Sequence, residues 1–144
     1  MTAVDDLDEV IEPYDRALDE FMTGNAEPVK EIFSHREDVT LANPYIPVGR
    51  GWEQVAQRLE RDASNFRDGE VTGFEPVAKY VTPELAYLVR VERAKAKVGG
   101  REDIVPIALR VTMIFRPEDS GWKVVHRHAD PITTAQPAES ILQE

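Results

Sequence analysis

Two histidines and an arginine stand together near the carboxyl end of the chain, as His126, Arg127 and His128. In a strand, His126 and His128 lie on one face while Arg127 points to the other. An imidazole titrates near neutral pH, which makes this pair a candidate for acid–base catalysis. The same spacing is able to chelate a metal ion, with Glu92 or Asp130 as a third ligand.

Further polar side chains fall on the same predicted sheet face as the histidines. With symmetric turns between the last three predicted strands, Thr112 lies opposite His126, Arg110 opposite His128, and Glu92 opposite Arg110. A buried arginine needs a partner, so Arg110 is interpreted as a structural ion pair with Glu92 or as a clamp for a carboxylate or enolate oxygen. A cation at this place opposes metal binding, so no metal site is expected. We favour a pocket-wall role for His126, and for His128 either that role or proton transfer.

The composition indicates a small globular protein and excludes several classes. A length of 144 residues suits one domain over residues 1–144, and the 42% hydrophobic and 31% charged content is ordinary. A net charge of -10 disfavours binding to a nucleic-acid backbone. The absence of cysteine excludes disulfides and thiolate chemistry. Charges interrupt every apolar run and the start of the chain is acidic, so we expect no membrane span, no leader and a cytoplasmic location.

The hydrophobic period changes part-way along the chain, and this change predicts the fold class. Apolar residues at helical spacing predict three helices, within residues 6–23, 25–33 and 52–66. After Gly69 the period becomes two, which predicts strands over residues 74–81, 85–98, 104–115 and 122–129. Helices followed by an antiparallel meander are typical of an α+β fold with helices on one face of a curved sheet. The polar tail after about residue 132 is expected to fray.

The stretches Leu109–Arg116 and Gly121–Asp130 together resemble the end of a SnoaL-like or DUF4440-type domain. These domains belong to the nuclear transport factor 2-like superfamily, which includes ketosteroid isomerases, polyketide cyclases and kinase association domains. The resemblance implies a cone-shaped, cystatin-like roll in which three N-terminal helices pack on a curved antiparallel sheet around a pocket. It also implies that the polar face with Glu92, Arg110 and the two histidines looks into the cone. The apolar face of the same sheet would then form a homodimer, through Leu109, Val111 and Met113.

Comparison with ketosteroid isomerases limits the chemistry that the resemblance implies. Asn43 stands where those enzymes carry a catalytic aspartate, and an amide does not abstract a carbon-bound proton at neutral pH. Tyr14 falls where that family keeps an oxyanion-hole tyrosine, whereas Ala108 or Val111 replaces its second acid. Steroid isomerisation is therefore disfavoured. Tyr14 and Asn43 remain candidate ligand-binding residues, together with Trp52 at the start of the third predicted helix.

Two functions of different classes are consistent with these residues. The first is an enzyme without a cofactor, an isomerase, cyclase or hydratase acting on a small organic molecule, either neutral or anionic. Proton transfer would fall to His126 or His128, while Arg110 and Tyr14 would polarise an oxygen. The second is a non-catalytic homodimer that binds a small acid or serves in assembly. Glu92 and Thr112 would line the pocket in either case. The resemblance does not decide between the two functions, because a shared fold does not imply a shared function.

Overall fold

The computed structural model describes residues 3–143. Three helices come first, α1 (Ala3–Phe21), α2 (Glu27–Ile32) and α3 (Trp52–Ala63), with the short strands β1 (Thr40–Ala42) and β2 (Gly49–Arg50) between α2 and α3. Four long strands follow: β3 (Phe66–Val81), β4 (Ala86–Val98), β5 (Val105–Glu118) and β6 (Gly121–Asp130). A short 3₁₀ helix, η1 (Ala138–Ile141), lies in the tail. This order of elements confirms the α+β class.

The strands form one six-stranded sheet in the order β2-β1-β6-β5-β4-β3. The four long strands are antiparallel neighbours, as predicted. The strand β2 was not predicted, whereas β1 falls within residues 38–42, which the sequence predicts to be extended, and it adds to the sheet by running parallel to β6. Segments of three and two residues are too short to show a period of their own, so only their pairing makes them strands.

The first long strand, β3, begins earlier than the sequence pattern predicts. Helix α3 ends at Ala63, and Phe66 already pairs with Val98 of β4. Asp68 has a positive φ of 53°, and the β3–β4 register shifts at this point, so the segment is a bulge and not a helix stop. Gly69 is required here, because a Cβ on it would lie 2.5 Å from the Cβ of Ala96.

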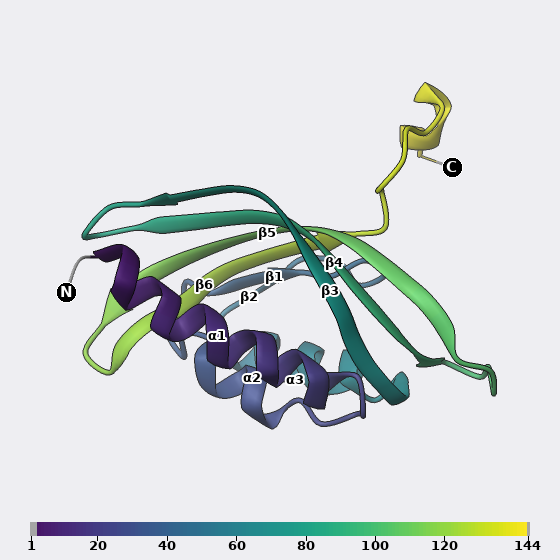
Figure 1. Ribbon diagram of the computed structural model, residues 1–144, viewed down its shortest axis with the longest axis horizontal. Helices are drawn as coiled ribbons and strands as arrows, with labels where there is room; N and C mark the ends of the chain where they lie inside the picture. Colours follow the sequence, from purple (N-terminus) through teal and green to yellow (C-terminus); the bar gives the residue numbers. More distant parts are fainter. Residues whose placement is uncertain (1–2, 144) are drawn as a thin grey trace.

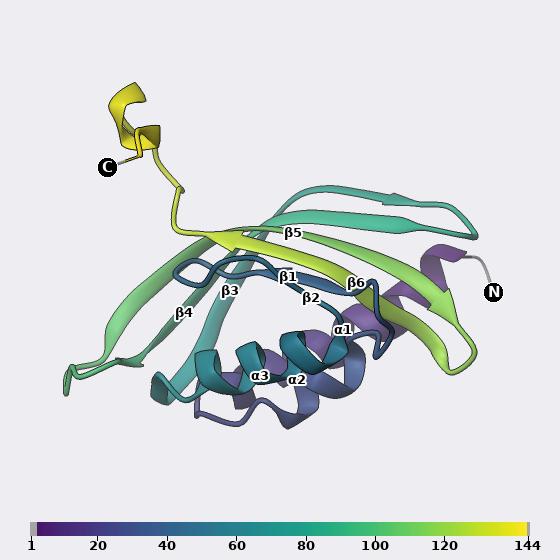
Figure 2. The same cartoon turned by 180° about the vertical axis from the view of Figure 1, so that it is seen from behind.

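The helices cover one face of the curved sheet, which we call the inner face (Figures 1 and 2). The opposite, outer face is left open, and the view from behind shows β1 and β2 beside β6. The core lies between the helices and the inner face, with Phe33, Met113 and Phe115 at most 1% exposed. Removal of these side chains from water stabilises the contact between helices and sheet.

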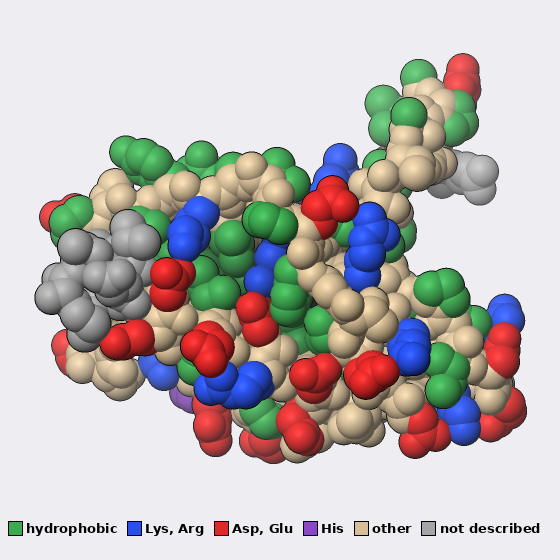
Figure 3. All heavy atoms as spheres, in the orientation of Figure 1, with side chains coloured by type: hydrophobic (Ala, Val, Ile, Leu, Met, Phe, Trp, Pro, Cys, Tyr) green, Lys and Arg blue, Asp and Glu red, His purple; other side chains and the backbone are tan. Residues whose placement is uncertain are grey.

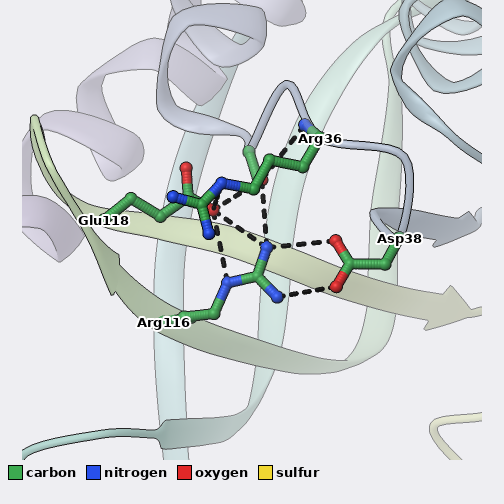
Figure 4. A network of polar contacts seen from close by, with 5 residues as sticks. Arg36, Asp38, Arg116 and Glu118 are labelled. Atoms are coloured by element: carbon green, nitrogen blue, oxygen red, sulfur yellow. Dashed lines mark hydrogen bonds and ion pairs between the residues drawn. The ribbon is translucent and has the colours of Figure 1, made fainter.

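An ion-pair network anchors the segment between α2 and β1 to the end of β5 (Figure 4). Arg116 contacts Asp38 at 2.8 and 3.1 Å and Glu118 at 2.9 Å. The buried Ser34 donates a hydrogen bond to Glu118 at 2.6 Å, and Arg36 lies 3.7 Å from the same carboxylate. Hydrogen bonding from Arg116 holds the pKa of Asp38 below its ordinary value. The network fixes the start of β1 and therefore the position of the loop that follows it.

The carboxyl-terminal tail stands away from the body of the molecule (Figures 1 and 3). All of its residues from 131 to 143 are exposed. Acidic side chains are spread over the visible surface in Figure 3, in keeping with the net charge of -10. Among residues 3–143, no helix combines the length and the apolar character needed to cross a membrane.

Candidate functional site

A cavity of about 210 Å³ lies between α1, the end of α3 and the inner face of β3, β4 and β5. Most of its wall is apolar, with contributions from Leu18, Phe21, Leu59, Phe66, Ile107 and Leu109. Polar and charged side chains interrupt this wall: Tyr14, Asn43, Tyr45, Asp62, Glu92, Arg93 and Arg127. A mainly apolar cavity with a few convergent polar groups is the usual form of a small-molecule site.

Asp62 is the group in this wall that is best suited to proton transfer. It lies in the last turn of α3, on the apolar stripe that contains Leu59, and is only 3% exposed. The amide of Asn43 donates a hydrogen bond to its Oδ2 at 2.6 Å, and the Tyr45 hydroxyl donates one to its Oδ1. Burial raises the pKa of Asp62 above its ordinary value, although these hydrogen bonds and the charge of Arg127 oppose the shift. A buried carboxylate of this kind acts as a general base or acid.

Two polar side-chain atoms in this region lack a hydrogen-bond partner among the described residues. Tyr14 lies on α1 and is 1% exposed, and burial raises its pKa to about 12, so its hydroxyl keeps its proton. No side chain within residues 7–143 forms a hydrogen bond with that hydroxyl. Asn43 is 8% exposed, and its Oδ1 is buried without a partner among the described residues. The Tyr14 hydroxyl is therefore a candidate hydrogen-bond donor to a ligand, whereas the Asn43 Oδ1 lies beneath the cavity surface.

Glu92 and Arg127 form a buried ion pair in the same wall. Nη2 of Arg127 lies 2.8 Å from Oε1 of Glu92, and Nη1 lies 3.2 Å from Oε2. On the other side of Glu92, Arg90 contacts Oε2 at 3.0 Å and reaches Asp15 at 2.7 Å. Burial alone would raise the pKa of Glu92, but the two arginines outweigh it and hold the pKa below its ordinary value. Glu92 is therefore ionised, and Arg127 has its counter-ion within the protein.

The orientation of β6 is inverted relative to the prediction. The β5–β6 register shifts after Val124, which leaves Val125 as an extra, bulged residue. An inserted residue reverses the face on which every later side chain lies. Val124 and Arg127 therefore both point to the inner face, where they are 0% and 6% exposed. His126 and His128 consequently lie on the outer face.

Four predicted site residues thus lie on the outer face, and the prediction that they look into the cone is wrong: Arg110, Thr112, His126 and His128. Arg110 pairs with Asp130, with contacts of 2.8 to 3.2 Å, and not with Glu92. The β4–β5 register differs from the predicted one by one residue, so Glu92 lies opposite Leu109.

Both histidines of the outer face contact protein groups. Nδ1 of His126 lies 2.7 Å from the hydroxyl of Thr40, and burial lowers the pKa of His126. Nε2 of His128 lies 2.9 Å from Asp130. Burial opposes ionisation of Asp130, but Arg110 and His128 lower its pKa to about 2. Neither histidine belongs to the cavity wall, and the side chains described for residues 7–143 contain no cluster of three acidic or histidine groups suited to a metal ion.

The other predicted ligand-binding residues divide between the cavity and the rest of the fold. Tyr14, Asn43 and Glu92 line the cavity. Trp52 does not, because it stacks on His35 with ring centroids 3.8 Å apart at the start of α3. The role of Tyr14, Asn43 and Glu92 in ligand binding stays a prediction.

The apolar strip of β5 that was predicted to meet a partner subunit belongs to the interior. Leu109 lines the cavity, and Val111 and Met113 are 0% exposed. The assignment of this strip to the outer face is therefore wrong, for the same register reasons.

Four polar residues of the cavity wall escaped prediction: Tyr45, Asp62, Arg93 and Arg127. Asp62 had a detectable signal, since it falls between Leu59 and Phe66 on the apolar stripe of the third predicted helix. A charged residue on such a stripe indicates a buried functional group. Tyr45 in its loop carried no comparable signal, and Arg127 was hidden by the bulge.

The fold is similar to that of solved structures described as NTF2-like, over most of the length of each chain. An NTF2-like superfamily protein from Salmonella enterica serovar Typhimurium has a TM-score of 0.76 at 19% identity, covering 91% of this chain and 92% of that one. A provisionally named dehydratase of the NTF2-like family from Streptomyces avermitilis has a TM-score of 0.75 at 20% identity, covering 91% and 96%. A ketosteroid isomerase-like protein from Erwinia carotovora atroseptica has a TM-score of 0.71 at 14% identity, covering 88% and 94%.

These identities establish the fold alone, and further relatives are described as having a cystatin-like fold, which confirms the predicted roll. The profile of the SnoaL-like domain matches residues 10–133, so the chain belongs to the SnoaL-like domain family. No functionally curated protein matches the sequence.

Proposed function

We propose that this protein is an acid–base enzyme for a small, mainly apolar molecule with a carbonyl or hydroxyl group, in the isomerase or dehydratase class. The observation that carries the proposal is Asp62, a carboxylate that is 3% exposed and lies in the wall of an apolar cavity. Tyr14 shares this cavity and keeps its proton. These two groups replace the histidines and Arg110 as candidate catalytic residues.

The chemistry follows from the two side chains. The Asp62 carboxylate removes a proton from the carbon next to a carbonyl, and the electron pair of the C–H bond moves onto the carbonyl oxygen. The Tyr14 hydroxyl stabilises the enolate oxygen by donating a hydrogen bond. Where a carbon–carbon double bond is conjugated with the enolate, Asp62 then returns the proton to the far carbon of that double bond while the electrons return from the enolate oxygen, which moves the double bond and completes an isomerisation. If the substrate has a hydroxyl group one carbon further away, Asp62 instead delivers the proton to it, and water leaves.

The cavity limits the size of the substrate. An engineered cavity of about 150 Å³ holds a benzene molecule in another protein. A volume of about 210 Å³ therefore suits a molecule of one ring with a short substituent. The names of two relatives support the reaction class, one a provisional dehydratase and the other ketosteroid isomerase-like. In this chain the amide of Asn43 would orient the base, and the base itself would come from α3.

Deuterium uptake by cyclohexanone in heavy water, followed by proton NMR, tests the proposal. We expect the protein to accelerate exchange, with a rate that rises with pH as Asp62 ionises and an apparent pKa above the ordinary aspartate value of 3.8. Asp62→Asn should lower the rate by roughly 100-fold or more. The matched control is Asp103→Asn, since Asp103 is exposed and pairs with Arg101 at 2.8 Å. Exchange at the wild-type rate in Asp62→Asn, or no acceleration by the wild-type protein, would refute this mechanism.

The homodimer stays a prediction, and the structure changes the residues that would form it. The outer face carries Thr112, Ile114 and His126, each of them partly exposed. A dimer built on this face would leave the cavity accessible, because the cavity lies on the inner face. A non-catalytic role in assembly would be favoured by a stable dimer that binds ketones without exchanging their protons.

A further inference from the structure

We propose that the cavity selects neutral molecules and excludes anions, so that its ligands are ketones and alcohols and not carboxylic acids. The inference rests on the cavity being the ligand site of the proposed function, and it is carried by the way the buried charges are paired. It runs against the anionic ligand that the sequence favours.

The buried charges in and behind the cavity wall leave no cation for a ligand. Three carboxylates, Asp15, Glu92 and Asp62, face two guanidinium groups, Arg90 and Arg127. With Asp62 ionised, the cluster carries one excess negative charge. Glu92, Asp62 and both arginines are at most 7% exposed, so water screens this charge poorly. An anion entering the cavity would meet a negative potential.

Among the described residues, Arg127 is the one buried cation in the wall, and its guanidinium already binds Glu92. The two contacts of 2.8 and 3.2 Å have the paired geometry in which a guanidinium binds a carboxylate best. A ligand carboxylate would have to displace Glu92, which would then be held by Arg90 alone. Leaving a buried ion without its partner is costly. A carboxylate therefore gains little from Arg127.

The other cation that contributes to the wall does not reverse this preference. Arg93 is half exposed, and its Nη2 lies 3.5 Å from Glu75 at the surface. Solvent and this neighbour screen its charge. The polar atom that remains for a ligand is neutral: it is the Tyr14 hydroxyl, which keeps its proton. A hydroxyl donor matches the oxygen of a carbonyl or a hydroxyl group.

A pair of probes with the same shape and different charge tests the inference. Methyl cyclohexyl ketone and cyclohexanecarboxylate differ mainly by the replacement of a methyl group with a charged oxygen. We expect isothermal titration calorimetry at pH 8 to show that the ketone binds. The carboxylate should bind with an affinity that is lower by roughly 100-fold or more. Carboxylate binding within about threefold of the ketone, or no ketone binding at millimolar concentration, would overturn the inference.

Two substitutions should shift the preference toward the carboxylate. Glu92→Gln frees the guanidinium of Arg127 and should raise the ratio of carboxylate to ketone affinity by about tenfold or more. Asp62→Asn removes the excess negative charge and should raise that ratio to a smaller extent. If Glu92→Gln does not fold, as judged by circular dichroism, Asp62→Asn decides, and an unchanged ratio there refutes the inference. Arg101→Gln is the matched control, because Arg101 is exposed and lies outside the cavity wall, and it should leave the ratio within about twofold of wild type.

These measurements separate the inference from the proposed function. Binding is measured without turnover, so loss of proton exchange in Asp62→Asn bears only on the proposed function. A protein that exchanges ketone protons yet binds the carboxylate equally well would retain its proposed function and lose the charge selectivity.

Discussion

Arg127→Met removes the cation from the buried pair with Glu92 and keeps an unbranched, though shorter, side chain. Arg127 and Glu92 are 6% and 7% exposed, so the remaining carboxylate stays in the interior. Breaking a buried pair on one side costs roughly 3–5 kcal/mol, and because Arg90 still contacts Glu92 at 3.0 Å we expect about 3 kcal/mol. With an m-value of roughly 2 kcal/mol/M, the urea midpoint should fall by about 1.5 M.

The loss of unfolding free energy in Arg127→Met should also depend on pH, and the pKa of Glu92 determines whether the loss grows or shrinks as the pH falls. In the wild-type protein this pKa lies below its ordinary value of 4.5, so the ionised pair stabilises the fold above that pH and the stabilisation is lost as the pH falls. The difference between wild type and Arg127→Met should therefore be largest at pH 7 and shrink below about pH 4.5.

Arg93→Met is the control for this experiment, since Arg93 lies on the same sheet, is half exposed and faces Glu75 at 3.5 Å. It should cost at most about 1 kcal/mol. If Arg127→Met costs no more than this control, the buried pair does not stabilise the fold and the charge assignment of the cavity is wrong.

Three further predictions concern the bulge, the outer face and the network of Figure 4. Gly69→Ala should lower the free energy of unfolding by roughly 1–3 kcal/mol, because the new Cβ would lie 2.5 Å from Ala96, whereas Gly100→Ala meets nothing within 4 Å and should change it by less than about 0.5 kcal/mol. Ile114→Glu should weaken a dimer in light scattering without unfolding the monomer, and an unaffected dimer would exclude the outer face as the interface. Arg116→Gln removes the hydrogen bond that lowers the pKa of Asp38. The wild-type protein loses stability as the pH falls through that pKa, and this loss should be smaller in Arg116→Gln. Thermal unfolding at pH 2–5 measures the difference.

The order and type of the main elements could be predicted because they depend on local patterns. The apolar stripe of α3 and the alternation along β5 are properties of neighbouring residues, so they are visible in the sequence. Short strands such as β1 are different, because their pairing partner β6 lies far along the chain. The three residues of β1 by themselves contain no pattern that indicates this pairing.

The contents of the cavity could be predicted only in part. Tyr14 and Asn43 were found through the resemblance to ketosteroid isomerases, which carry functional side chains on the first helix and in the loop after the first strand. Glu92 was expected on the inner face, but its partner was wrong, since a shift of one residue in the β4–β5 hairpin places it opposite Leu109.

The sequence by itself determined the α+β class, the succession of three helices and four long strands, and the resemblance to the SnoaL-like family. The tertiary structure alone decided which end-strand residue enters the cavity. Side chains alternate with a period of two, so the single bulged residue Val125 turns Arg127 inward and His126 and His128 outward. The tertiary structure also placed Asp62, which lies in helix α3, beside the loop residues Asn43 and Tyr45. Contacts of this kind depend on how distant segments pack, and no local pattern in the chain records them.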